Sequence, residues 1–255
     1  LMFSFLALIT SLDAIALPSG RRSFCIDDDN VPGAGRAARE IGGLWYTLCV
    51  TTQTPAVLKA RQMSQIALIP NLNDGAGARA NATANRLDAS DRVIHDWYRF
   101  VLSFPPHLVR AYLDRFSLTP GQTVLDPFCG TGTTVVEAKL HGIGGVGVEA
   151  NALAHFASSV KTDWTVDPDE LLACAQEIAK NAAQEITADP TDNLRTLGAE
   201  AESLLLKDSI SPLPLHKALV LLEAIAQAPT RPCHRHLRLA LARTLIYDVS
   251  NLHFG

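Results

Sequence analysis

The stretch DPFCGTGTT, residues 126–134, decides how the middle of this 255-residue chain folds. Its two glycines suit a tight turn, because glycine adopts backbone conformations that other residues resist. Thr123, Val124 and Leu125 precede it and indicate a short buried strand that ends at Asp126. The stretch then leads into a predicted helix over residues 133–140, which Gly142 closes. A strand, a glycine-rich turn and a helix are therefore expected in that order.

A second strand and further helices follow this turn. Residues 145–148 indicate a strand that ends at Glu149, and a helix is expected from Ala152 onward. Together these elements make one βαβ unit. Beyond Pro168 the pattern is almost wholly helical, with apolar residues at spacings of three and four. The sequence predicts an α/β fold, a partial Rossmann-like unit with a helical segment after the second strand.

The two strand ends carry the chemistry that the sequence offers. In an open α/β sheet the ligand binds at the carboxyl ends of the strands, where Asp126 and Glu149 are expected. Glycines let the backbone approach a ligand closely, and an acid on the second strand suits ribose hydroxyls. Two acids with two glycines suit an adenosine ligand that also carries an amino group. A phosphate-binding loop fits poorly, because residues 130–134 lack its lysine.

The stretch at 126–134 resembles the S-adenosylmethionine (SAM) binding motif of the N4-cytosine and N6-adenine DNA methyltransferases. Its Pro-Phe pair and Thr-Thr tail are more specific than a bare pair of glycines. Residues 95–109 look like the family's motif X helix, which precedes the SAM loop and completes the cofactor pocket, and residues 146–151 look like the motif whose acid holds the ribose. The resemblance covers roughly residues 92–160 and implies a SAM-dependent methyltransferase fold, with SAM as cofactor and double-stranded DNA as partner.

The resemblance also implies a role for each matching residue. Asp126 would face the methionine end of SAM, and Glu149 would hold its ribose. Phe128, Gly130 and Gly132 would shape the floor of the pocket. Thr131 and Thr133 would supply donors near the SAM carboxylate. Phe104 and Pro105 would pack on the cofactor from the motif X side.

The family's catalytic motif, Asp/Asn/Ser-Pro-Pro followed by an aromatic residue, does not occur in the sequence. In the family this motif binds the exocyclic amine and stacks on a flipped base. Residues 104–107 have the double proline but neither flank, and residues 211–214 lack adjacent prolines. No catalytic residue is therefore predicted, and we expect the catalytic strand to lie beyond Gly255 in a longer protein.

Three functions stay open at this point. The leading one is a DNA methyltransferase that acts on N6 of adenine or N4 of cytosine, truncated and inactive on its own. The alternatives are an RNA methyltransferase of the tRNA guanine-N2 type and a catalytically inactive SAM-binding or scaffold protein. Neither the recognition sequence nor a restriction endonuclease partner can be read from the sequence.

The rest of the chain divides into three predicted segments. Residues 1–91 are expected to be a leader, disordered or translated from a wrong start, with Met63 as the natural start and ordered structure from about residue 90. Residues 92–165 form the SAM-binding segment, with a helix predicted over 93–102 and another from Pro105 to about Phe116. Residues 166–255 form a helical segment.

Composition limits the binding partners and the cellular location that the sequence favours. The net charge of −4 gives no overall basic field, which counts mildly against DNA binding. Five scattered cysteines without a CxxC pair support neither a zinc ribbon nor a disulfide framework, and they favour a reducing, cytoplasmic location. The apolar run at residues 2–17 is too short and too broken by Asp13 to span a bilayer, and it lacks the basic start of a signal peptide.

A basic cluster near the end of the chain could contact DNA phosphates, although a solvated helix face is the favoured interpretation. Cys233, His234 and His236 lack the second ligand pair of a zinc site, so no metal is predicted. The cluster consists of Arg231, His234, Arg235, His236, Arg238 and Arg243.

Overall fold

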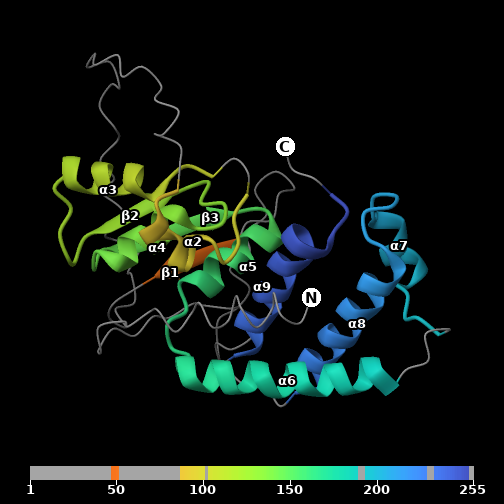
Figure 1. Cartoon of the computed structure of the whole chain (residues 1–255). Helices are drawn as coiled ribbons and strands as arrows, with labels where there is room; N and C mark the ends of the chain where they lie inside the picture. The colour runs from red at the N-terminus through yellow and green to blue at the C-terminus, as the bar shows by residue number, and fades with distance from the viewer. Residues whose placement is uncertain (1–46, 52–86, 101–102, 189–192, 229–232, 253–255) are drawn as a thin grey trace, which may run out of the picture.

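The computed structural model of the protein describes residues 47–51, 87–100, 103–188, 193–228 and 233–252. For residues 47–51 only the backbone is described. Figure 1 shows a small sheet with its helices at one side of the molecule and the later helices α6 to α9 at the other. None of the helices in the described ranges has the length and apolar character required to span a bilayer.

A parallel pair of strands forms the centre of the predicted βαβ unit. Strand β2, Thr123–Asp126, pairs with strand β3, Gly144–Glu149, so that Asp126 lies opposite Gly147. Helix α4, Thr133–Leu140, connects the two strands, and Gly142 ends it with a φ of 76°. The predicted strand, turn, helix and strand are therefore all present, within a residue of the expected bounds. The prediction that the first strand is buried is wrong, because Thr123 and Leu125 are exposed on β2, which lies at the edge of the described sheet.

A third strand, which the sequence analysis did not predict, lies on the other side of β3. Strand β1, Thr47–Thr51, pairs antiparallel with β3, and Thr47 lies opposite Glu149. The strand order is β1-β3-β2. This strand falls inside the predicted leader of residues 1–91, most of which lies outside the described residues.

The segment before the sheet differs from the prediction at its first helix. A short 3-10 turn, Ala89–Asp91, leads into α2, which spans only Arg92–His95, whereas a helix was predicted over 93–102. The chain leaves the helix at this point because Trp97 and Tyr98 turn inward, and both belong to the main hydrophobic core. Residues 101–102 lie outside the described ranges.

Helix α3, Pro106–Arg115, begins where the double proline predicts a helix start. Proline is well suited to the first turn, because its missing N–H would have had no partner there. Val109 and Leu113 lie one turn apart and pack with Ala138 of α4 and with Ile143 in a second, smaller core. This packing fixes α3 against α4, the helix that leaves the glycine-rich loop.

The helical part of the chain consists of α5 to α9. Helix α5, Ala152–Lys161, follows β3, and residues of α5, α8 and α9 complete a core around the apolar stripe that was predicted on α6. Leu171, Ala175, Ile178 and Ala182 of that stripe are buried, as predicted. The bounds of the later elements are Pro168–Ala188 for α6, Ala199–Leu204 for α7, Pro212–Gln227 for α8, His234–Thr244 for α9 and Leu245–Val249 for a final π-helical turn.

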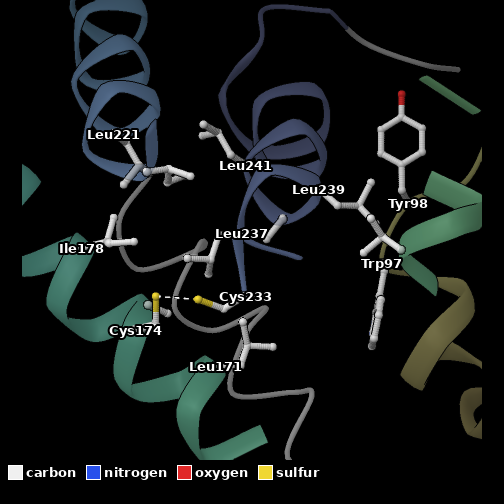
Figure 2. Packing of buried hydrophobic residues seen from close by; sticks show 14 of the residues in the cluster. Trp97, Tyr98, Leu171, Cys174, Ile178, Leu221, Cys233, Leu237, Leu239 and Leu241 are labelled. Carbon is white, nitrogen blue, oxygen red and sulfur yellow. Dashed lines mark hydrogen bonds between the residues drawn. The ribbon is translucent and has the colours of Figure 1, made fainter. Parts of the chain in front are cut away.

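Helix α9 joins the two sides of the molecule. It packs against α8 on one side and against α5 on the other. Figure 2 shows Leu237 and Leu241 of α9 beside Leu221 of α8, while Leu239 lies toward Trp97. Arg195 adds a polar link, because it pairs with Glu185 of α6 and with Glu223 of α8.

Candidate cofactor site

The loop between β2 and α4 has a backbone that only glycine adopts without strain. Gly130 has a φ of 52° and Gly132 a φ of 91°, both in the left-handed region. A Cβ added to Gly132 would lie 2.6 Å from Oγ of Ser158, which belongs to α5. A Cβ on Gly130 would meet nothing within 4 Å. The loop is therefore packed against α5 at Gly132 and open at Gly130.

The same loop lies directly on strand β3. The backbone N–H of Cys129 donates to the carbonyl of Val148 at 3.1 Å. A Cβ added to Gly147 would lie 2.7 Å from Sγ of Cys129, so a glycine is needed on the strand as well as in the loop. The small residues at 129, 132, 147 and 158 together allow loop, strand and helix to approach closely.

Asp126 organises the loop from the end of β2. Its Oδ1 accepts a hydrogen bond from the N–H of Phe128 at 3.0 Å, and its Oδ2 accepts one from Oγ1 of Thr134 at 2.6 Å. The two oxygens of this one carboxylate therefore bind the first and the last part of the loop. The role of Thr134 was not predicted, although the residue belongs to the stretch that decided the fold.

Glu149 reaches the same loop from the end of β3. Its Oε2 accepts a hydrogen bond from the N–H of Gly130 at 2.8 Å, and its Oε1 accepts one from the N–H of Asn151 at 2.7 Å. Asn151 in turn caps α5 through its side chain, which accepts from the N–H groups of Leu153 and Ala154. The structure thus brings Asp126, Gly130 and Glu149 together, as the strand ends predicted.

The two carboxylates give the site a negative field. The pKa of Cys129 is raised to about 11, mainly by burial and also by the charges of Asp126 and Glu149, while a hydrogen bond to Ser158 opposes the shift. A field that disfavours a thiolate favours a cation at the same place. A ligand with a positive charge would be stabilised there.

The other predicted site residues are placed differently. Phe128 projects from the loop with 84% of its surface exposed, whereas Thr131 and Thr133 are buried. Phe104 is exposed and Pro105 is buried at the N-terminal end of α3. Helix α3 packs on α4, so these two residues are linked to the loop through that helix pair.

A buried polar network, which the sequence analysis missed, holds α2 and α3 against α4. Glu137 of α4 is 1% exposed, and it accepts hydrogen bonds from Nε2 of His95 at 2.7 Å and from Nη1 of Arg110 at 3.3 Å. Arg110 also binds both carboxylate oxygens of Asp91 at 2.9 Å. No pattern in the sequence connects these residues, because they lie on four separate elements.

Several side chains of the basic cluster near α9 form contacts within the protein. Arg235 donates to Oγ of Ser159 at 2.6 Å and lies over the ring of Phe156. Arg243 donates to the carbonyl of Asp96 at 3.3 Å and to Asp248, and His236 is buried. A solvated helix face is therefore the wrong interpretation for these three side chains. Arg238 is exposed, and Arg231 lies outside the described residues.

The described residues contain no group of three or more His, Cys, Asp or Glu side chains that could hold a metal ion.

Two parallel strands, a glycine loop and an acid at each strand end are consistent with an α/β domain of the methyltransferase class. Comparison with known families agrees: residues 38–156 match the family described as DNA methylase, and residues 103–220 match an RMKL-like methyltransferase domain. The first match begins ahead of β1 and of Met63. These matches support the assignment of residues 38–156 to the N4/N6 DNA methyltransferase family.

One relative is matched over a short stretch of its length. A stretch of 69 residues is 39% identical to the type II methyltransferase M.BsoBI of Geobacillus stearothermophilus. The stretch is 27% of this chain and 14% of that relative, so the chain matches only a small part of it. No solved structure matches the chain.

Proposed function

We propose that this chain binds SAM at the loop of residues 126–134 and belongs to an enzyme that methylates an exocyclic amine of DNA, N6 of adenine or N4 of cytosine. The observation that carries the proposal is the convergence of Asp126 and Glu149 on one glycine-rich loop, at the carboxyl ends of two parallel strands. The match of residues 38–156 to the DNA methylase family supports both the cofactor and the reaction class.

The residues at the loop fit SAM in shape and in charge. The open space over Gly130 gives a ligand access to backbone, and the two carboxylates suit the ammonium and sulfonium charges and the ribose hydroxyls. When bound, SAM supplies an electrophilic methyl group on its sulfonium.

Each predicted site residue has a proposed role in SAM binding. Glu149 would hold the ribose, and Asp126 would keep the loop in shape beside the methionine end. Phe128, Gly130 and Gly132 would form the floor of the pocket, Thr131 and Thr133 would supply donors near the carboxylate of the cofactor, and Phe104 and Pro105 would cover it from α3.

Positioning of the amine beside the sulfonium supplies much of the rate in such a reaction. Since the family's catalytic motif is absent from these residues, we expect this chain alone to bind SAM without transferring its methyl group. A match to a second methyltransferase domain keeps an RNA substrate as the alternative to DNA.

Calorimetric titration with SAM tests the binding site. The Glu149→Gln variant should bind SAM about 10- to 100-fold more weakly, because hydrogen bonds to a charged group contribute roughly 1.5–3 kcal/mol. Glu200→Gln is the matched control, since Glu200 is exposed on α7, and its affinity should equal that of the wild type. Absence of SAM binding by the wild-type chain would overturn the proposal.

Transfer is measured separately, with radiolabelled methyl groups and either duplex DNA or tRNA as acceptor. The chain alone should label neither acceptor. Labelling of DNA would show that catalytic residues are present after all, whereas labelling of tRNA alone would replace the DNA proposal with the RNA alternative.

A further inference from the structure

Two cysteines that are distant in the sequence meet inside the helical core. Cys174 lies in the second turn of α6, and Cys233 immediately precedes α9, 59 residues later. Their sulfur atoms are 2.8 Å apart, and the Sγ–H of Cys233 donates to Sγ of Cys174. Figure 2 shows the two sulfur atoms pointing toward each other.

The surroundings of the pair are apolar and closely packed. Both cysteines are almost completely buried, and Leu171, Ile178 and Leu237 lie around them in the same core. Both side chains are thiols in the structure. A disulfide bond is about 2.05 Å long, so the sulfur atoms need to move by less than an ångström to form one.

We propose that Cys174 and Cys233 form an oxidisable dithiol, which hydrogen peroxide converts to a disulfide that links α6 to the start of α9. The thiolate sulfur of one cysteine attacks a peroxide oxygen, the O–O bond breaks, and a sulfenic acid and hydroxide form. The second thiol sulfur then attacks the sulfenic sulfur, the S–O bond breaks and hydroxide leaves. The two thiol protons and the two hydroxides end as two molecules of water, so the cysteines lose two electrons and the peroxide gains them.

The disulfide would close a loop that contains α7 and α8. A cross-link between distant residues stabilises the folded state mainly by restricting the unfolded chain. The pair is independent of the SAM site, because the proposal needs only the contact between α6 and α9.

Cys129, whose side chain is also described, provides the matched comparison. Cys129 is also buried, but the side chain at its sulfur is the hydroxyl of Ser158 at 3.9 Å rather than a thiol. Oxidation of the folded chain should therefore join Cys174 to Cys233 and leave Cys129 outside the cross-link.

Peptide mapping of the whole chain tests this directly. The folded protein is treated with hydrogen peroxide, alkylated, and digested with trypsin, which releases Cys174 in the peptide 162–180 and Cys233 in the peptide 218–235. The expected product is these two peptides joined, with a mass two hydrogens below their sum, and the joined species should vanish on reduction. It should persist in Cys129→Ala and be absent from Cys174→Ala and Cys233→Ala.

Thermal unfolding gives a second readout that does not depend on the folding of any variant. The oxidised wild-type protein should unfold about 5–10 °C above the reduced protein, and a thiol reductant should reverse the shift. Three outcomes would each overturn the proposal: cross-links that mainly involve Cys25 or Cys49, sulfinic or sulfonic acid at Cys174 without a cross-link, or no reaction in the folded protein.

Discussion

At Gly132 two constraints act on a single residue, and both predict the effect of adding a methyl group. The backbone lies at a φ of 91°, and the new Cβ would lie within 3.0 Å of the backbone Cα of Ser158 as well as against its hydroxyl. Gly132→Ala should therefore lower the free energy of unfolding by about 2–4 kcal/mol and weaken SAM binding, because the loop and α5 must move apart.

Gly130→Ala is the matched control for this prediction, since Gly130 has a positive φ but open space around the added Cβ. It should lower the free energy of unfolding by only about 1 kcal/mol. Urea unfolding of the two variants measures the difference. Equal losses would show that the contact with Ser158 does not constrain the loop.

Lys161 is a residue whose burial should appear in the pH dependence of stability. Its pKa is lowered from 10.5 to about 7, mainly by burial and also by the charge of Arg99, while Asp96 opposes the shift. Between about pH 7 and 10.5 the unfolded chain thus binds more protons at this residue than the folded chain does. The contribution of Lys161 to stability should therefore rise with pH by about 1.4 kcal/mol per unit in this window and be constant below pH 7.

Urea unfolding from pH 6 to 9.5 checks this, with Lys161→Met as the variant and Lys180→Met, at an exposed position of α6, as the control. The difference between wild type and Lys161→Met should change with pH above 7, whereas the difference between wild type and Lys180→Met should be flat. A flat difference for Lys161→Met would show that its ammonium has an ordinary pKa.

At the scale of elements, the position of α3 depends on one buried carboxylate. Glu137 accepts from both His95 and Arg110, and so joins α2, α3 and α4. Glu137→Ala should lower the free energy of unfolding by about 2–3 kcal/mol, since it leaves the buried imidazole of His95 without its acceptor and removes one of the two carboxylates that Arg110 binds. Glu185→Gln is the control, because Glu185 forms an exposed ion pair with Arg195 and its loss should cost less than about 1 kcal/mol. Similar losses in urea unfolding would mean that the network does not hold the helices together.

How much of these elements the sequence predicted depends on how local their causes are. The loop and α4 could be placed closely, because Gly132, Gly142 and the double proline at 105–106 mark boundaries by their own backbone preferences. The helix over 93–102 was overpredicted, since aromatic residues such as Trp97 fit a helix as well as a turn and only the tertiary core decides between them. The convergence of Asp126 and Glu149 followed from strand ends alone.

Contacts between distant segments could not be predicted in this way. Three such contacts join residues from separate elements: Ser158 with Gly132, Glu137 with its network, and the sulfur atom of Cys174 with that of Cys233. No residue spacing in the sequence predicts them. Strand β1 was missed for the same reason: it has five residues and no sustained alternation, and its partner β3 lies about a hundred residues later.

At the scale of the whole molecule, β1 decides whether the predicted leader can be removed. The strand covers one edge of β3 up to Glu149, which is opposite Thr47 in the register. An uncovered strand edge presents unpaired N–H and C=O groups and favours association with other chains. A shortened chain that starts at Met63 should therefore unfold at lower urea concentration, self-associate and bind SAM more weakly, because the strand that presents Glu149 loses its neighbour.

A second shortened chain, starting at residue 38 where the family match begins, keeps β1 and is the matched control. It should retain the unfolding midpoint and the SAM affinity of the full chain. Urea unfolding, light scattering and calorimetry of the three proteins show whether this segment is a leader or part of the domain. If the chain from Met63 matches the full chain in all three measurements, β1 contributes nothing to the domain and residues 1–62 are a leader, as the sequence predicted. If only the chain from Met63 is impaired, the methyltransferase domain begins ahead of β1, and Glu149 depends on a strand from the opposite end of the matched region.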